Sequence, residues 1–128
     1  MPNFETYKEI AQARGALALE LYVVVSTPVE GGASVPDTLP EHLEYQAELE
    51  RSTRLMMAGP LSDLTGQSIE GAGLIIYRAT SMDDARAIAA ADPMHSKGAR
   101  QFELRKWLVN EGSLTVSVGL STGSTALL

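Results

Sequence analysis

The sequence predicts an α+β fold in a single domain. Short runs rich in β-branched and aromatic residues, such as LYVVV and GLIIY, indicate buried strands. Longer segments with helical periodicity separate these runs, which gives the order strand, helix, strand, strand, helix, strand. This order matches the split βαβ pattern of ferredoxin-like folds, with one additional element expected at each end.

The first elements are a short helix over residues 3–14 and a strand over residues 17–26. The strand segment, LALELYVVVS, is rich in β-branched and aromatic residues and ends at Thr27-Pro28. A loop rich in Gly and Pro follows it, and Asp37 or Thr38 is expected to cap the next helix. That helix has Pro40 in its first turn, runs to about Met57 and is stopped by Gly59-Pro60.

The second half of the chain predicts a hairpin, a helix and further strands. Residues 59–79 contain a short strand, a Gly-containing turn and a longer strand. Ser81 with Asp84 has the spacing of a capping box, and it opens an alanine-rich helix that Pro93 ends. Residues 101–109 form a strand, and the alternation over residues 113–121 predicts a half-buried one. The tail from residue 112 on has no charged residue and is expected to pair with another strand, of this chain or of a second subunit.

The composition excludes several classes of function. Ten Lys and Arg against sixteen Asp and Glu leave a formal charge of −6, which repels nucleic acids and anionic membranes. The chain has no cysteine, so disulfides, thiolate metal sites and a thiol nucleophile are excluded. The charged N-terminal segment is unlike a signal peptide, and no apolar run approaches the roughly 20 residues that cross a bilayer. We therefore expect a cytoplasmic protein.

His42 lies on the neutral face of the long predicted helix. At 100° per residue, Leu49 and Gln46 fall near its direction, and the charged residues of the helix point elsewhere. A histidine on an inward face is most often a structural residue with satisfied ring nitrogens. The positive end of the helix dipole nevertheless favours a neutral ring that can accept a proton, so His42 is a candidate site residue.

Asp92 is the matching candidate. It ends the alanine-rich helix, where the helix dipole disfavours a negative charge, and by periodicity it continues the inward stripe of that helix. One interpretation is that Asp-Pro merely starts a turn. The other is that Asp92 approaches His42, because a carboxylate orients an imidazole and fixes its tautomer for general acid–base chemistry.

Four segments together form a recognisable pattern: ELYVVV, EHLEYQAELERSTRLMMAGPL, GAGLIIYRATSMDDARAIAAADPM and FELRKWLV. Over roughly residues 19–109 this pattern resembles the YCII family, also called YciI-like proteins. The resemblance implies a dimeric α+β barrel, in which two ferredoxin-like subunits pack their sheets together. Residues 1–18 are then an N-terminal extension, and residues 112–128 a C-terminal strand and tail. The family's proposed active-site histidine and aspartate fall on His42 and Asp92.

The resemblance also implies a chemistry. Some relatives are implicated in dehydrochlorination of ring compounds, so proton abstraction from a small cyclic or aromatic substrate is expected. Many members carry an arginine shortly before the histidine, where this chain has Asp37 and Glu41, and this difference weakens the case for an anionic substrate. The residue after Asp-Pro is usually aromatic, whereas here it is Met94. We expect Met94 to be a substrate-binding residue.

Three further side chains are open to two interpretations. Tyr45 is expected to donate a hydrogen bond to substrate, or to lie at the edge of the stripe with its hydroxyl in water. Trp107 is expected to wall the pocket, or to pack in the core or a dimer interface. His95 is a second proton carrier or metal ligand, or a loop histidine, and the second reading is favoured because no ligand cluster accompanies it.

Together these observations predict a homodimer with a cofactor-free and metal-free pocket for a small molecule. In this hypothesis His42 is the general acid or base, Asp92 orients it, and the reaction is an elimination or isomerisation. The alternative is a noncatalytic ligand-binding or stress-associated dimer in which the two residues stabilise the fold.

Overall fold

The computed structural model describes residues 1–127. The chain divides into two compact units: Leu19–Leu108, and the terminal segments Met1–Ala18 with the chain from Val109 on. The prediction of a single domain stays a prediction. No helix among residues 1–127 has the length and apolar composition needed to cross a bilayer.

The larger unit is a four-stranded sheet covered by helices. Its strands lie in the order β2-β3-β1-β4, and β3 runs antiparallel to both β1 and β2. In chain order the elements are β1 (Leu19–Pro28), α2 (Val35–Arg51), β2 (Leu55–Ser62), β3 (Ile69–Tyr77), α3 (Met82–Ala91), α4 (Pro93–Ser96) and β4 (Arg100–Val109). The sheet order and the βαββαβ connectivity confirm the predicted ferredoxin-like α+β fold.

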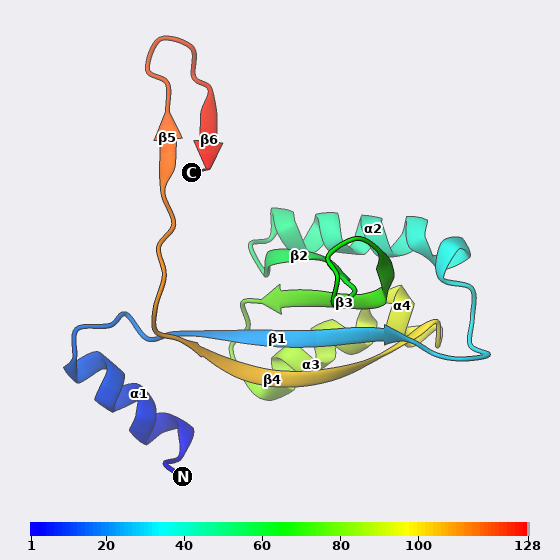
Figure 1. Cartoon of the computed structure of the whole chain (residues 1–128), viewed down its shortest axis with the longest axis horizontal. Coiled ribbons are helices and arrows are strands. Elements are labelled where there is room, and N and C mark those ends of the chain that lie inside the picture. The colour runs from blue at the N-terminus through cyan, green and yellow to red at the C-terminus, as the bar shows by residue number, and fades with distance from the viewer. Residues whose placement is uncertain (128) are drawn as a thin grey trace. The chain divides into compact units, whose positions relative to one another are not determined.

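The helices of this unit cover one face of the sheet (Figure 1). Alternate residues of β1 and β3 point to that face, and the register pairs Tyr22 with Tyr77 and Val24 with Ile75. These four side chains form the core with residues of α2 and α3, namely Leu49, Ala85, Ile88 and Ala89. The small alanines of α3 let this helix approach the sheet closely.

The boundaries predicted for α2 are wrong at both ends. Ser34 caps the helix, since its hydroxyl accepts a hydrogen bond from the Asp37 backbone N–H at 3.2 Å. The helix ends at Arg51, because Thr53 adopts the left-handed conformation with φ of 64°. The chain then enters β2, and Gly59-Pro60 lies inside this strand. An edge strand tolerates proline because backbone N–H groups on its outer side have no neighbouring strand to donate to.

The predicted hairpin and the predicted start of α3 are confirmed. Strands β2 and β3 pair directly across a turn stabilised by Asp63, whose carboxylate accepts the backbone N–H of Thr65 at 3.0 Å. Ser81 caps α3 by accepting the Asp84 backbone N–H at 3.0 Å. The Asp84 carboxylate completes the cap one residue earlier than a standard capping box, by accepting the backbone N–H of Thr80 at 2.9 Å.

The terminal segments contain a helix and a small hairpin. Helix α1 (Phe4–Ala13) is capped by Asn3 and confirms the predicted N-terminal helix. Strands β5 (Val116–Val118) and β6 (Thr125–Leu127) pair antiparallel. The extra C-terminal strand is therefore present as β5, but all residues of β5 and β6 are exposed, so the half-buried character predicted for residues 113–121 is not seen within the single chain. Leu128, the end of the predicted tail, lies outside the described residues.

Candidate functional site

A cleft of about 920 Å³ opens on the larger unit. Helix α2 forms one wall with Leu39, His42, Leu43 and Gln46, and β2 and β3 form another. Residues of α4 and β4, namely Met94, His95 and Arg100, close one part of it together with Ser26 of β1. A mostly apolar cleft of this size with a few convergent polar groups suits a small organic molecule.

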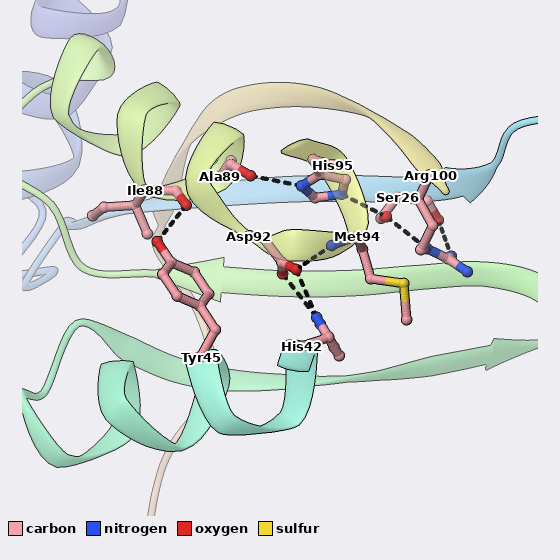
Figure 2. A network of polar contacts seen from close by, with 9 residues as sticks. All are labelled: Ser26, His42, Tyr45, Ile88, Ala89, Asp92, Met94, His95 and Arg100. Carbon is pink, nitrogen blue, oxygen red and sulfur yellow. Dashed lines mark hydrogen bonds and ion pairs between the residues drawn. The ribbon is translucent and has the colours of Figure 1, made fainter. Parts of the chain in front are cut away.

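His42 and Asp92 meet beside this cleft, and their predicted convergence is confirmed. His42 Nδ1 lies 2.8 Å from Asp92 Oδ1 and 2.9 Å from Oδ2 (Figure 2). The Asp92 side chain is completely buried, while that of His42 is 18% exposed. Helix α2 presents His42 on the same face as the buried residues Gln46 and Leu49, as the periodicity predicted, and Thr38 is also buried on this face.

The position of Asp92 is more favourable for a carboxylate than the sequence indicated. It follows the last residue of α3 and is also the N-cap of the short helix α4, and its Oδ1 accepts the Met94 backbone N–H at 2.9 Å. A carboxylate is favourable at a helix start, which offsets its unfavourable position at the end of α3. The Asp-Pro pair was the available signal, because Asp at the cap followed by Pro at the first helical position starts helices.

This geometry determines the tautomer of His42. The Asp92 carboxylate can only accept, so Nδ1 carries the proton and donates it to Asp92. In the neutral ring Nε2 then carries the lone pair, and no residue among the described positions 1–127 bonds to it. His42 therefore presents a proton-accepting nitrogen at the wall of the cleft, and the carboxylate behind it can stabilise the imidazolium that forms.

A second polar network lies in the same cleft, and sequence reasoning missed it. His95 Nδ1 lies 2.7 Å from the Ala89 carbonyl oxygen, and His95 Nε2 lies 2.8 Å from Ser26 Oγ (Figure 2). Arg100 Nε donates to the same Ser26 Oγ at 2.8 Å. Because the carbonyl requires a donor and Arg100 occupies the acceptor side of Ser26, the consistent assignment has Ser26 donating to a neutral His95. Burial lowers the pKa of His95 and favours that neutral form.

Of the three predicted substrate-binding residues, one lines the cleft and two do not. Met94 lines the cleft. The Tyr45 hydroxyl donates to the Ile88 carbonyl oxygen at 2.7 Å, and its partly buried ring packs against the core, so Tyr45 is bonded within the chain and does not line the cleft. Trp107 is 42% exposed and lines a depression on the opposite face of the sheet. Neither Tyr45 nor Trp107 lines the cleft of the same chain, so their substrate-binding roles stay predictions.

His95 differs from the loop histidine that the sequence favoured, because both its ring nitrogens are bonded within the cleft wall. No group of three or more His, Asp or Glu side chains in the described part of the chain is arranged to hold a metal ion.

The sequence matches the YCII-related domain over residues 21–108. The chain belongs to this family. The uncharacterised protein YjpA of Bacillus subtilis is 33% identical over 66 residues, which cover 52% of this chain and 71% of YjpA. The YCII-related chain also resembles the solved structure of 5-chloro-2-hydroxyhydroquinone dehydrochlorinase TftG from Burkholderia phenoliruptrix, in complex with 2,5-dihydroxybenzoquinone. The TM-score is 0.54 at 19% identity, covering 68% of this chain and 92% of TftG, and this similarity shows a shared fold.

The two contacts of Asp92 can be separated by substitution. Asp92→Asn keeps an oxygen that accepts the Met94 N–H, whereas Asp92→Ala leaves this buried donor unpaired and α4 uncapped. We expect Asp92→Ala to lower the free energy of unfolding by about 1–3 kcal/mol more than Asp92→Asn does. Urea denaturation of both variants measures the difference, and equal values would contradict the capping role.

The buried His95 predicts a pH dependence of stability. Its pKa in the folded chain lies below 6.5, so the unfolded chain binds a proton first as the pH falls. The stability that neutral His95 contributes is complete above about pH 6.5 and is lost as the pH falls towards the folded-state pKa. Between pH 7 and pH 5 we expect the free energy of unfolding to fall more steeply for the wild type than for His95→Gln. Parallel curves would show that His95 does not titrate differently in the two states.

Proposed function

We propose that the protein is a general acid–base catalyst, with His42 as the proton carrier and Asp92 as the residue that orients it. Its reaction is an elimination or an isomerisation of a small cyclic or aromatic molecule. The observation that carries this proposal is the His42–Asp92 hydrogen bond at the cleft wall, which leaves Nε2 of His42 as a proton acceptor. The dehydrochlorinase activity of TftG, which shares the fold, supports the choice of chemistry.

The chemical step follows from this arrangement. Nε2 of His42 takes a proton from a C–H or O–H group of the substrate, and the released electron pair forms a new double bond. In an elimination a leaving group such as chloride departs with its bonding electrons; in an isomerisation the imidazolium returns the proton to a different carbon. Asp92 stabilises the imidazolium while it lasts. After an elimination, the proton passes to water before the next cycle.

The second candidate function is noncatalytic ligand binding with a structural His–Asp pair. The observation that favours it is the complete burial of Asp92 together with its cap on α4, since a structural role is enough to explain both. The two functions differ in one respect: only the catalyst exchanges protons with a bound carbon acid.

Deuterium exchange tests the catalytic proposal without knowledge of the natural substrate. The protein in D2O is incubated with a panel of small cyclic ketones, lactones and phenols and with 5-chloro-2-hydroxyhydroquinone, and NMR and chloride release follow the reaction. We expect exchange or elimination with at least one compound, and a loss of about 100-fold or more in His42→Gln. Glu44→Gln, at an exposed position of the same helix, is the control. Full activity in His42→Gln, or no reaction with any compound while ligands still bind, would favour the noncatalytic function.

We also propose that two copies pair through the face of the sheet opposite α2, α3 and α4. Val23, Val25, Leu74 and Ile76 form an apolar depression of about 380 Å³ on this face together with Trp107. Val25 is 39% exposed and Trp107 42%. Apolar surface at the centre of a sheet is characteristic of an interface.

A cytoplasmic location of the protein is a separate part of the proposed function.

A charge in the sheet centre tests the pairing. Val25→Glu places a carboxylate beside Leu74, so we expect light scattering to give a mass near 13.7 kDa for the variant and about twice that for the wild type. Ala87→Glu, on the exposed side of α3, adds the same charge away from the sheet and keeps the dimer. A wild-type monomer at micromolar concentration would refute the proposal.

A further inference from the structure

Arg100 brings a positive charge into the cleft. Its Nε donates to Ser26 Oγ at 2.8 Å and its Nη2 to the Ser26 carbonyl oxygen at 2.7 Å and to the Gly71 carbonyl oxygen. These contacts fix the plane of the guanidinium and leave the two N–H groups of Nη1 without a partner among residues 1–127. No carboxylate in that range lies within ion-pair distance of Arg100. The group is thus held rigidly, charged, and free on one side.

Gln46 supplies a second polar group in the same cleft. It lies one turn after His42 on α2 and lines the cleft, yet the residue is only 8% exposed. Its amide oxygen is buried and has no hydrogen-bond partner. A buried amide without a partner is costly in a folded protein and calls for an explanation. Because the terminal torsion of glutamine is soft, the amide can turn either end towards a ligand.

We propose that Arg100 and Gln46 recognise the substrate at two points, so that the cleft takes a small ring carrying an anionic oxygen and a hydroxyl group. Arg100 binds the anionic oxygen through Nη1, and Gln46 binds the hydroxyl beside His42. This inference rests on the proposed function for the identity of the reacting site, and it adds the substrate class. Apolar side chains such as Leu39 and Leu43 cover the faces of the ring.

The sequence had weakened the case for an anionic substrate, because Asp37 and Glu41 precede His42. The structure removes that objection. Lys97 Nζ neutralises Glu41 at 2.5 Å, and neither Asp37 nor Glu41 lines the cleft. The acidic residues that do line it, Glu50 and Glu70, are exposed to solvent, which screens their charges. The positive charge in the cleft comes from Arg100 of β4. It does not come from a residue shortly before His42, where many family members carry an arginine.

Three probes separate the two contacts. At pH 7, 2,5-dihydroxybenzoate offers both an anionic oxygen and hydroxyl groups, benzoate offers only the anion, and hydroquinone only hydroxyl groups. Ligand-observed NMR titrations give a Kd for each with the wild type, Arg100→Gln and Gln46→Met. Arg86→Gln, at an exposed position of α3, is the control for the change in net charge, and circular dichroism checks the fold of each variant.

We expect Arg100→Gln to weaken 2,5-dihydroxybenzoate and benzoate by about tenfold or more and to leave hydroquinone unchanged. Gln46→Met should weaken 2,5-dihydroxybenzoate and hydroquinone by about fivefold and leave benzoate unchanged. The Gln46→Met variant should also melt at a higher temperature, because it removes a buried polar group that has no partner. Arg100→Lys keeps the positive charge but lacks the planar N–H donors of the guanidinium, and we expect it to bind benzoate more tightly than Arg100→Gln does.

The proposal is overturned if the wild type binds none of the probes, if Arg86→Gln weakens benzoate as much as Arg100→Gln, or if both cleft variants affect all probes alike. His42→Gln separates this inference from the catalytic proposal, because we expect it to retain benzoate binding while losing proton exchange. Selective effects of Arg100 and Gln46 without any proton exchange in the wild type would support the two-point binding site and refute the catalyst.

Discussion

The hydrogen bond between His42 and Asp92 is the constraint on which the cleft depends. A completely buried carboxylate is tolerated only when its oxygens are bonded. Asp92 meets this requirement with the His42 ring and the Met94 backbone N–H, and in doing so it joins α2 to the junction of α3 and α4. These helices come from opposite halves of the βαββαβ unit, so one polar contact positions the His42 ring and links the two helical parts of the cleft wall.

The two histidines show how the hydrogen-bond partner of Nδ1 affects the chemistry of an imidazole. Both have Nδ1 anchored within the protein, His42 on a carboxylate and His95 on the Ala89 carbonyl oxygen. A carboxylate compensates the charge of an imidazolium, whereas a carbonyl dipole does so weakly. His95 is also desolvated, which lowers its pKa. His42 is therefore suited to carrying a proton, and His95 is suited to remaining neutral and holding Ser26 and, through it, Arg100.

Much of the fold could be predicted from local signals. Ser81 and its neighbours start α3, and the run of β-branched residues ending at Ser26 lies in a central strand, because capping and propensity act over a few residues. The end of α2 could not be predicted in this way. Thr53 has no glycine-like freedom, and Leu55 and Met57 fit a helix or a strand equally until β3 is available to pair with them. Pairing across the sheet, and not propensity, decided that boundary.

The sequence by itself determined the α+β class and the inward face of α2, because periodicity marks them locally. It also marked His42 and Asp92 as candidates through the unusual placement of their charges, but it left open whether the two side chains meet. Only the tertiary structure decided that Ser26, His95 and Arg100 form one network, and that the buried amide oxygen of Gln46 lacks a partner. Ser26 and Arg100 are 74 positions apart and each looks ordinary in its own segment. Their contacts arise from proximity, which is a property of the packed chain: burial removes water as an alternative partner and leaves these groups to bond to each other.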